Sequence, residues 1–158
     1  AIEDLSDLFR ASLNGSHEQS TFADELTLAQ HYLNIETLRL GERLAVEWHV
    51  QGIPAGISMP PLTLQPLLEN AIYHGIERLP DGGIIHVDGS CRDALVEIAI
   101  SNPVPGTETG GPREGNRIAQ ENIRQRLQLA FGGRAGLLTS LEGNIYKVLL
   151  RFPEARVT

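Results

Sequence analysis

The chain contains a single cysteine, Cys91, and no apolar run close to the roughly 20 residues that a membrane-spanning helix requires. A lone cysteine excludes an internal disulfide framework and is typical of proteins in a reducing compartment. No signal peptide is present either. Because the sequence begins in the middle of a helical pattern, we expect it to be a fragment, with any membrane segment lying upstream.

Basic residues are also scarce, with 13 Lys and Arg against 20 Asp and Glu and a formal net charge of -7. A protein that binds DNA or RNA without sequence preference needs a basic face, so the composition argues against a nucleic-acid partner. An anionic ligand is still compatible, since a helix N-terminus or one metal ion can hold phosphates locally. The length of 158 residues indicates one domain with a sizeable core.

Hydrophobic periodicity predicts an order of helices and strands. Helices are expected over residues 1–13, 21–40, 64–75 and 117–131, and strands over 43–50, 83–91, 94–101, 135–141 and 144–152. This order predicts an α+β fold: a two-layer α/β sandwich with a mixed sheet of about five strands and helices on one face. Short hairpin connections between strands argue against a doubly wound parallel sheet.

Local signals refine these elements. Thr21, followed by Asp24 and Glu25, is a helix start, and Gly41 is a helix end. Pro60 and Pro61 suit a helix entrance, and Pro66 must lie in the first turns of that helix or kink it. Residues 102–116 hold four Gly and three Pro and predict a mobile lid or binding loop. The candidate buried positions of the following helix are Ile118, Ile123, Leu127 and Ala130.

The segment LQPLLENAIYHG, residues 64–75, is a mostly apolar helix that carries Glu69, Asn70 and His74. Asn70 and His74 are four residues apart and therefore stack on one helix face. An Asn oxygen can coordinate Mg²⁺, and a His can donate a hydrogen bond to a phosphate oxygen. The alternative is that both side chains brace neighbouring backbone, and the pattern alone does not separate the two. Glu36, on the apolar face of another helix, is expected to pair with a nearby arginine.

Two longer segments resemble a known family. PPLTLQPLLENAIYHG, residues 60–75, resembles the asparagine box of histidine kinases of the LytS/YehU type, and HYLNIETLRLGERLAVEW, residues 31–48, is similar to the segment upstream of that box. These kinases belong to the superfamily that includes gyrase B and MutL, and the finer resemblance is to the AlgZ/FimS branch. The resemblance implies a Bergerat-type ATP-binding domain in residues 17–158, preceded in residues 1–16 by the end of a dimerisation and phosphoacceptor helix region.

By this resemblance, Asn70 would hold the Mg²⁺ that bridges the phosphates of ATP, and His74 would lie near the phosphates or the ribose. Glu69 occupies the family's catalytic glutamate position. Pro66 stands where many ATP-hydrolysing members have an acidic residue that activates water. That substitution argues against a third possibility, an ATP hydrolase.

The glycine boxes of the family are only partly kept. In the first, Asn102 replaces the aspartate that accepts from adenine, Val104 replaces a glycine and Gly106 is retained. An amide oxygen accepts a weaker hydrogen bond than a carboxylate does, so adenine affinity is in question. In the second, Gly115 is retained, while Arg117, Ala119 and Gln120 replace glycine, glycine and leucine. Arg117 could compensate through its charge or could block the site.

After these boxes, Asn122, Arg124, Arg126 and Leu127 keep a pattern of the family. Asn122 and Arg126 are candidate nucleotide-binding residues. Arg126 either braces the lid or is a surface arginine on an amphipathic helix.

The resemblance implies a kinase that transfers the γ-phosphoryl group of ATP to a histidine on an upstream helix, for onward transfer to a response regulator. No histidine in the chain matches the family's acceptor motif. The full protein would be a homodimer, the fragment a monomer, and the location the cytoplasmic side of a bacterial inner membrane. The alternative is a degenerate domain that has lost nucleotide binding and acts as an interaction module. Intact Asn70 and His74 favour the kinase.

Overall fold

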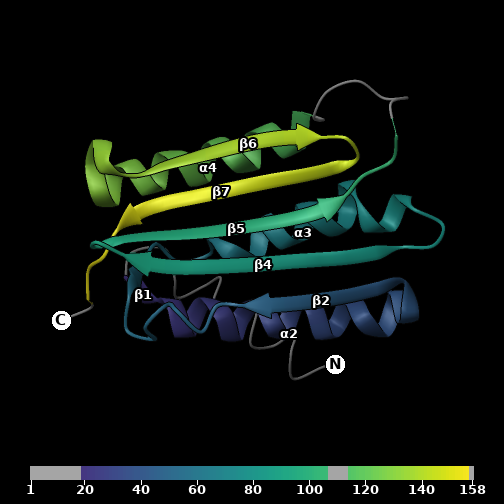
Figure 1. Ribbon diagram of the computed structural model, residues 1–158, viewed down its shortest axis with the longest axis horizontal. Coiled ribbons are helices and arrows are strands. Elements are labelled where there is room, and N and C mark those ends of the chain that lie inside the picture. The colour runs from purple at the N-terminus through teal and green to yellow at the C-terminus, as the bar shows by residue number, and fades with distance from the viewer. Residues whose placement is uncertain (1–18, 107–113, 157–158) are drawn as a thin grey trace.

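The computed structural model describes residues 19–106 and 114–156. The helix expected over residues 1–13 and the boundary expected after residue 16 lie outside these ranges, as does the centre of the loop expected over 102–116. Figure 1 shows two layers, with a sheet on one side and the helices on the other. The predicted two-layer α+β architecture is therefore confirmed.

The main sheet has five strands in the order β2-β4-β5-β7-β6. Their bounds are β2 Leu44–His49, β4 Gly83–Arg92, β5 Leu95–Pro103, β6 Gly136–Glu142 and β7 Ile145–Pro153. Strands β2 and β4 are parallel, and the other neighbours are antiparallel, so the sheet is mixed as predicted. A second, two-stranded ribbon pairs β1 (Ser20–Thr21) with β3 (Ser58–Met59). The sequence does not predict this ribbon, because two-residue strands carry no readable alternation.

Three described helices cover one face of the sheet (Figure 1). Their bounds are α2 Phe22–Leu40, α3 Leu64–His74 and α4 Glu114–Phe131, and the short 3₁₀ turns are η1 Gly41–Arg43, η2 Ile76–Arg78 and η3 Gly132–Arg134. Helix α2 begins where Thr21 Oγ1 accepts from the Asp24 N–H at 3.1 Å, and it ends at Gly41 with φ 60°. Both predicted ends are confirmed, and so is the expected pair between Glu36 and Arg39, at 2.8 Å. In the part of the chain described, no helix combines the length and apolar character that a bilayer-spanning segment requires.

The core lies between the helices and the inner face of the sheet. Strand β5 shows why: its burial alternates residue by residue, with Val96, Ile98 and Ile100 turned inward. The largest fully buried side chains are Phe152, Ile57, Met59, Leu64, Leu68, Ile72, Ile76, Ile85, Ile98, Ile123, Leu127 and Leu150. All but Ile57 and Met59 lie on α3, on α4, on η2 or on strands of the main sheet.

Helix α4 corrects part of the predicted core. Ile123 and Leu127 are buried as expected, but Ile118 is 56% exposed and Ala130 is also exposed. The buried stripe instead continues to Phe131, whose ring stacks on Phe152 at 5.3 Å. Phe131, one residue further along the helix, occupies the core-facing place that was expected for Ala130, while Ile118 lies off this stripe.

The entrance of α3 corrects a second expectation. Pro60 and Pro61 do not open the helix, because it begins at Leu64 and the chain before it is not helical. Pro66 lies in the first turn, as required, where its missing N–H removes no helical hydrogen bond.

Candidate functional site

Helix α3 places the polar residues of the asparagine motif beside a buried stripe. Its core face consists of Leu64, Leu67, Leu68, Ala71 and Ile72. Asn70 and His74 are half-buried, and Glu69 is the more exposed of the three. Partial burial raises the pKa of the Glu69 carboxyl, and the nearby charge of Glu36 adds to this, against a hydrogen bond from Gln65. The helix thus carries a polar strip at its edge, as the spacing predicts.

Asn70 has a polar atom that no described residue satisfies. Its Nδ2 is buried and has no hydrogen-bond partner within residues 19–106 and 114–156. Buried side-chain polar atoms almost always have a partner, and the amide nitrogen and oxygen can exchange places. The idea that Asn70 only braces neighbouring backbone gains no support from this nitrogen. The side chain suits a ligand from outside the protein.

The C-terminal end of α3 lies directly against the end of β5. A Cβ atom at Gly75 would lie 2.2 Å from Asn102 Nδ2 and 2.6 Å from the Pro103 carbonyl oxygen, so the close approach requires glycine. Figure 1 shows α3 and β5 ending on the same side of the molecule. Asn102 is therefore brought against Gly75, the residue that ends α3 and follows His74 in the chain.

Asn102 is buried, with 3% of its surface exposed, and its Nδ2 donates to the Pro103 carbonyl oxygen at 2.9 Å. Because this nitrogen is engaged, adenine would have to be met by the amide oxygen. Gly106 follows at a less crowded point, where an added Cβ would lie 3.9 Å from Asn144 Oδ1 in the turn between β6 and β7. The Val104 N–H fixes this stretch by donating to the Asn144 carbonyl at 2.8 Å.

The site residues expected on α4 are not all brought close to the polar residues of α3. Gly115 lies in its first turn, while Arg117 and Asn122 are exposed, and no described contact joins either side chain to α3. Gln120 is buried, and its Nε2 donates to the Tyr146 hydroxyl at 2.6 Å. The side chain that replaces the family's leucine thus belongs to the packing between α4 and β7.

Arg126 is not a surface arginine, and the loop that it was expected to brace has its centre outside the described residues. Its guanidinium is half-buried and donates to the main-chain carbonyls of Pro61 and Leu62, the latter from Nη2 at 2.5 Å. Both carbonyls belong to the segment that leads into α3.

Glu25 forms hydrogen bonds to the same segment. The sequence analysis does not predict it as a site residue. Its side chain is buried, with 3% exposed, and accepts from the N–H groups of Leu62, Thr63 and Leu64 at 3.1, 2.7 and 3.2 Å. The available signal was position: Glu25 follows Phe22 by three residues and precedes Ala29 by four, which places a carboxylate on the apolar face of α2.

The two charges lie in the protein interior, which disfavours ionisation of both. Burial raises the pKa of Glu25, while the three backbone N–H groups and the charge of Arg126 oppose that rise. Burial lowers the pKa of Arg126, and Glu25 opposes that fall. Each charge therefore partly compensates for the burial of the other.

Comparison with known proteins identifies the family. A family model described as histidine kinase matches residues 1–44. The sensor histidine kinase YesM of Bacillus subtilis is 31% identical over 142 residues, which cover 86% of this chain and 24% of YesM. The sensor protein LytS of Streptococcus agalactiae is 29% identical over 165 residues, which cover 97% of this chain and 28% of LytS. The chain belongs to the sensor histidine kinase family. It spans about a quarter of the length of these relatives.

Solved structures of this family share the fold. The catalytic domain of histidine kinase ThkA matches with a TM-score of 0.61 at 14% identity, covering 89% of this chain and 99% of that one. ThkA in complex with the response regulator TrrA matches with a TM-score of 0.62 at 12% identity, covering 98% of this chain and 48% of that one. At these identities the likeness shows the fold alone, which agrees with the Bergerat-type prediction. The finer resemblance to the AlgZ/FimS branch stays a prediction.

The described residues fit a magnesium-bound nucleotide in the chemistry of their donors. Within residues 19–106 and 114–156, no group of three or more His, Cys, Asp or Glu side chains is arranged to hold a metal ion. A divalent ion here would therefore rely on a neutral ligand such as Asn70, together with phosphate oxygens and water, a set that Mg²⁺ accepts. Asn70 Nδ2 is buried without a partner among these residues, and exchanging the amide nitrogen and oxygen would turn an oxygen ligand toward such an ion.

Proposed function

We propose that residues 17–158 are the ATP-binding catalytic domain of a sensor histidine kinase. The domain binds ATP with Mg²⁺ and presents the γ-phosphoryl group to a histidine on an upstream helix, and a response regulator then receives it. Residues 1–16 are the end of the dimerisation and phosphoacceptor helix region. The observation that carries the proposal is the Nδ2 of Asn70, buried and without a partner among the described residues, on a helix that ends against Asn102.

Each residue has a role that follows from its chemistry. Asn70 would hold Mg²⁺, His74 would donate toward phosphate or ribose, and Asn102 would accept from adenine. Glu69 is the carboxylate beside the metal ligand. Bound Mg²⁺·ATP supplies the activated phosphoryl group, while the protein contributes position and charge neutralisation.

Four further residues are proposed to face the phosphates. They precede and follow residues 107–113 in the chain: Gly106, Gly115, Arg117 and Asn122.

The position of the site on α3 explains why the metal is needed. Asn70 and His74 lie in the C-terminal half of the helix, where its partial negative charge opposes phosphate. Pro66, where a water-activating acid would stand, supports phosphotransfer rather than hydrolysis.

The partners follow from the family. The ThkA structure holds a response regulator, which supports the same class of partner for this protein. The full-length protein is proposed to be a homodimer, with this domain on the cytoplasmic side of a bacterial inner membrane.

A second candidate, a degenerate interaction module, is favoured by specific side chains. Asn102 offers adenine a neutral amide oxygen in place of a carboxylate, and Gln120, which replaces the family's leucine, donates to the Tyr146 hydroxyl. If Asn102, Val104, Arg117 and Ala119 each weaken binding by about one hydrogen bond, at about 1 kcal/mol each, affinity falls by more than about a hundredfold.

Calorimetric titration with a non-hydrolysable ATP analogue, with and without Mg²⁺, tests the proposal. The parent chain should bind in a Mg²⁺-dependent manner, and Asn70→Ala should weaken that binding by about tenfold or more, because one metal ligand is lost. Asn34→Ala, which truncates an exposed amide on α2, is the matched control and should bind like the parent.

Two results would count against the proposal. No heat at millimolar nucleotide leaves the interaction module as the better function. Parent-like binding by Asn70→Ala, with the fold intact by circular dichroism, shows that the metal assignment is wrong.

A further inference from the structure

The segment that leads into α3 is held in an unusual backbone conformation. Leu62 has φ 54°, in the left-handed region that residues with a Cβ rarely adopt. Such a conformation persists only where the surroundings impose it. The structure shows what imposes it, because the N–H and the carbonyl of Leu62 are both held by charged side chains.

Helix α3 does not cap its own N-terminus. Thr63 occupies the cap position, but its side chain makes no capping bond, and its hydroxyl donates to the Pro60 carbonyl at 2.7 Å. Pro66 in the first turn has no N–H to satisfy. The Thr63 and Leu64 N–H groups are met by Glu25, which reaches across from α2. The start of α3 is therefore set by another helix.

Arg126 completes the arrangement from the opposite side. It extends from α4 and holds the carbonyls of Pro61 and Leu62, while Glu25 holds the N–H groups of Leu62 and the two residues that follow. We call Glu25 and Arg126 the α3 clamp. The clamp connects three helices through four consecutive residues of main chain.

We propose that the α3 clamp positions Asn70 for the magnesium-bound nucleotide, so that Glu25 and Arg126 are positioning residues of the kinase. This inference rests on the proposed function. Asn70 follows Thr63 by seven residues, about 10 Å along a helix that transmits any shift or rotation of its first turn. Arg126 also ties α3 to α4, whose first turns carry Gly115 and Arg117. The clamp thereby fixes the two proposed phosphate-facing elements relative to each other.

The substitutions Glu25→Gln and Arg126→Lys test the clamp with little change in volume. Glu25→Gln places an NH₂ group against backbone N–H donors, and Arg126→Lys keeps the charge but loses the fork that reaches two carbonyls. The matched controls are Glu97→Gln and Arg151→Lys. They make the same chemical changes in an exposed ion pair on the other face of the sheet, with Arg151 Nε 2.7 Å from Glu97 Oε2.

Two measurements on the 158-residue chain separate positioning from a merely structural role. The first is the position of the Asn70 side-chain amide resonance in ¹H–¹⁵N spectra without nucleotide. The second is the affinity for the ATP analogue with and without Mg²⁺. Both clamp variants should shift the Asn70 resonance and weaken the Mg²⁺-dependent binding by about tenfold, while Mg²⁺-independent binding and both controls stay like the parent. Combined with Asn70→Ala, they should cause no further loss.

The opposite results are equally clear. Clamp variants that melt at a lower temperature but keep the parent's Asn70 resonance and Mg²⁺-dependent affinity would show a structural role only. If the parent binds no nucleotide, the proposed function fails, and the resonance alone decides the clamp: an unshifted Asn70 amide overturns it, and a shifted one sustains it.

Discussion

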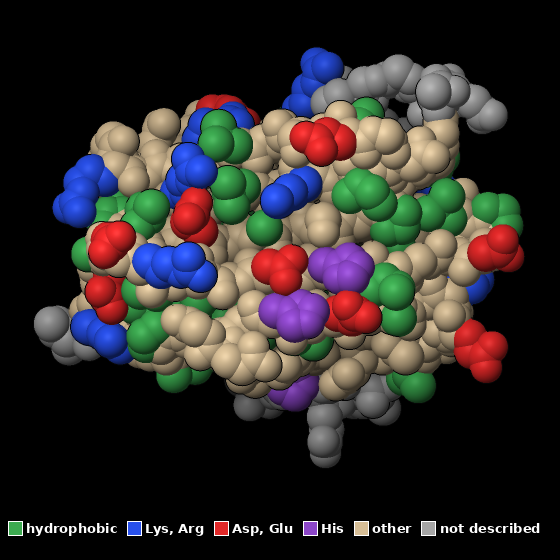
Figure 2. Space-filling model, viewed as in Figure 1, with side chains coloured by type: hydrophobic (Ala, Val, Ile, Leu, Met, Phe, Trp, Pro, Cys, Tyr) green, Lys and Arg blue, Asp and Glu red, His purple; other side chains and the backbone are tan. Residues whose placement is uncertain are grey.

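Two regions of this protein use the same kinds of charged side chain, carboxylate and guanidinium, in different ways. In the helical layer, Glu25 and Arg126 are buried or half-buried, and each holds main-chain groups at the start of α3. On the open face of the sheet, charged side chains pair with one another in solvent, as between Glu97 and Arg151. Figure 2 shows this face, with acidic, basic and histidine side chains intermixed.

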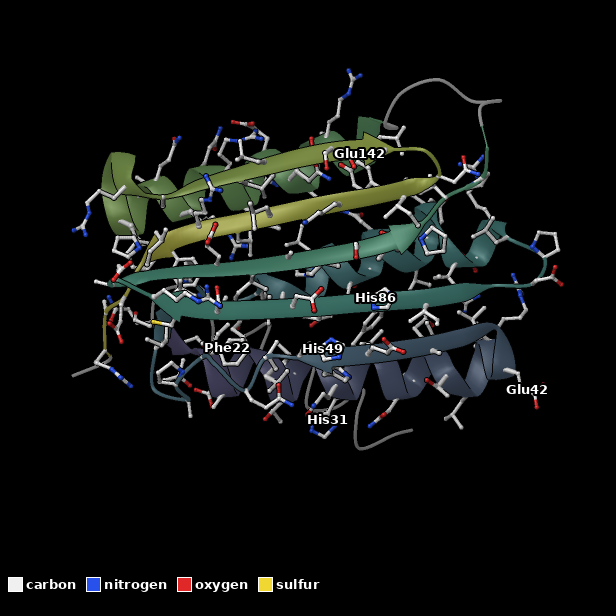
Figure 3. The ribbon with its side chains drawn as sticks, viewed as in Figure 1. Phe22, His31, Glu42, His49, His86 and Glu142 are labelled. Atoms are coloured by element: carbon white, nitrogen blue, oxygen red, sulfur yellow. The ribbon has the colours of Figure 1, made fainter. Side chains whose placement is uncertain are left out.

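The open face has a regular pattern because strand register creates it. Parallel strands β2 and β4 place Glu47 opposite His86 and His49 opposite Asp88. The two pairs are 3.2 and 3.1 Å apart, and their side chains are 41–59% exposed. Figure 3 shows both histidines on neighbouring strands, on the face turned away from the helices. Solvent screens such pairs, which contribute about 0–1 kcal/mol each.

The difference teaches that burial, rather than charge, decides what an ionic group does here. A buried charge that loses its partners costs about 3–5 kcal/mol, because water cannot replace them. The clamp can therefore hold Leu62 in a left-handed backbone conformation, whereas the exposed pairs contribute too little free energy to impose one.

The largest effect should come from truncating the buried carboxylate of Glu25, compared with the same truncation at the exposed Glu97. Glu25→Ala removes the acceptor of three backbone N–H groups. It also leaves the guanidinium of Arg126 bonded to its carbonyls but without a counter-charge. The free energy of unfolding should therefore fall by about 3 kcal/mol. Glu97→Ala should change it by less than about 0.5 kcal/mol. Urea unfolding followed by circular dichroism measures both. Equal effects would remove the contrast between the two regions.

A smaller effect is expected where α3 meets β5. Gly75→Ala places a Cβ 2.2 Å from Asn102 Nδ2 and 2.7 Å from the Ala71 carbonyl, which should cost about 1–3 kcal/mol through overpacking. Gly136→Ala, on strand β6, meets no atom within 4 Å and should be within about 0.5 kcal/mol of the parent. The same urea series applies, and a neutral Gly75→Ala would contradict the close approach of helix and strand.

The smallest effect is a dependence on pH that isolates the buried carboxyl. Burial raises the pKa of Glu25 above its ordinary value of 4.5. Protonation is therefore favoured more in the folded state, and the stability that it contributes is present below pH 4.5 and is lost as pH rises through the raised pKa. Glu25→Gln cannot titrate at this position, so the difference in unfolding free energy between the parent and this variant should shrink as the pH rises through the raised pKa. Urea unfolding at a series of pH values measures it, and a difference that grows with pH would reverse the sign of the argument.

Much of the fold could be predicted because its signals are local. Thr21 and Gly41 bound α2 through contacts within one turn, and alternation over a few residues marks β5. The asparagine motif predicts both a family, which its relatives confirm, and a site, which stays a proposal. The exposed Ile118 shows the limit, since periodicity gives the faces of a helix but not which of them meets the sheet.

The sequence by itself determined the three described helices, the five strands of the main sheet, their order along the chain and the polar strip on α3, because caps, turns and periodicity depend on residues that are close along the chain. Only the tertiary structure decided that Glu25 accepts a hydrogen bond from Thr63, 38 residues away in the chain, and that Arg126 donates one to Leu62, 64 residues away. A carboxylate and a guanidinium acquire such partners when packing removes them from water, since the cost of burying each charge must then be met by whatever main-chain groups the fold brings near.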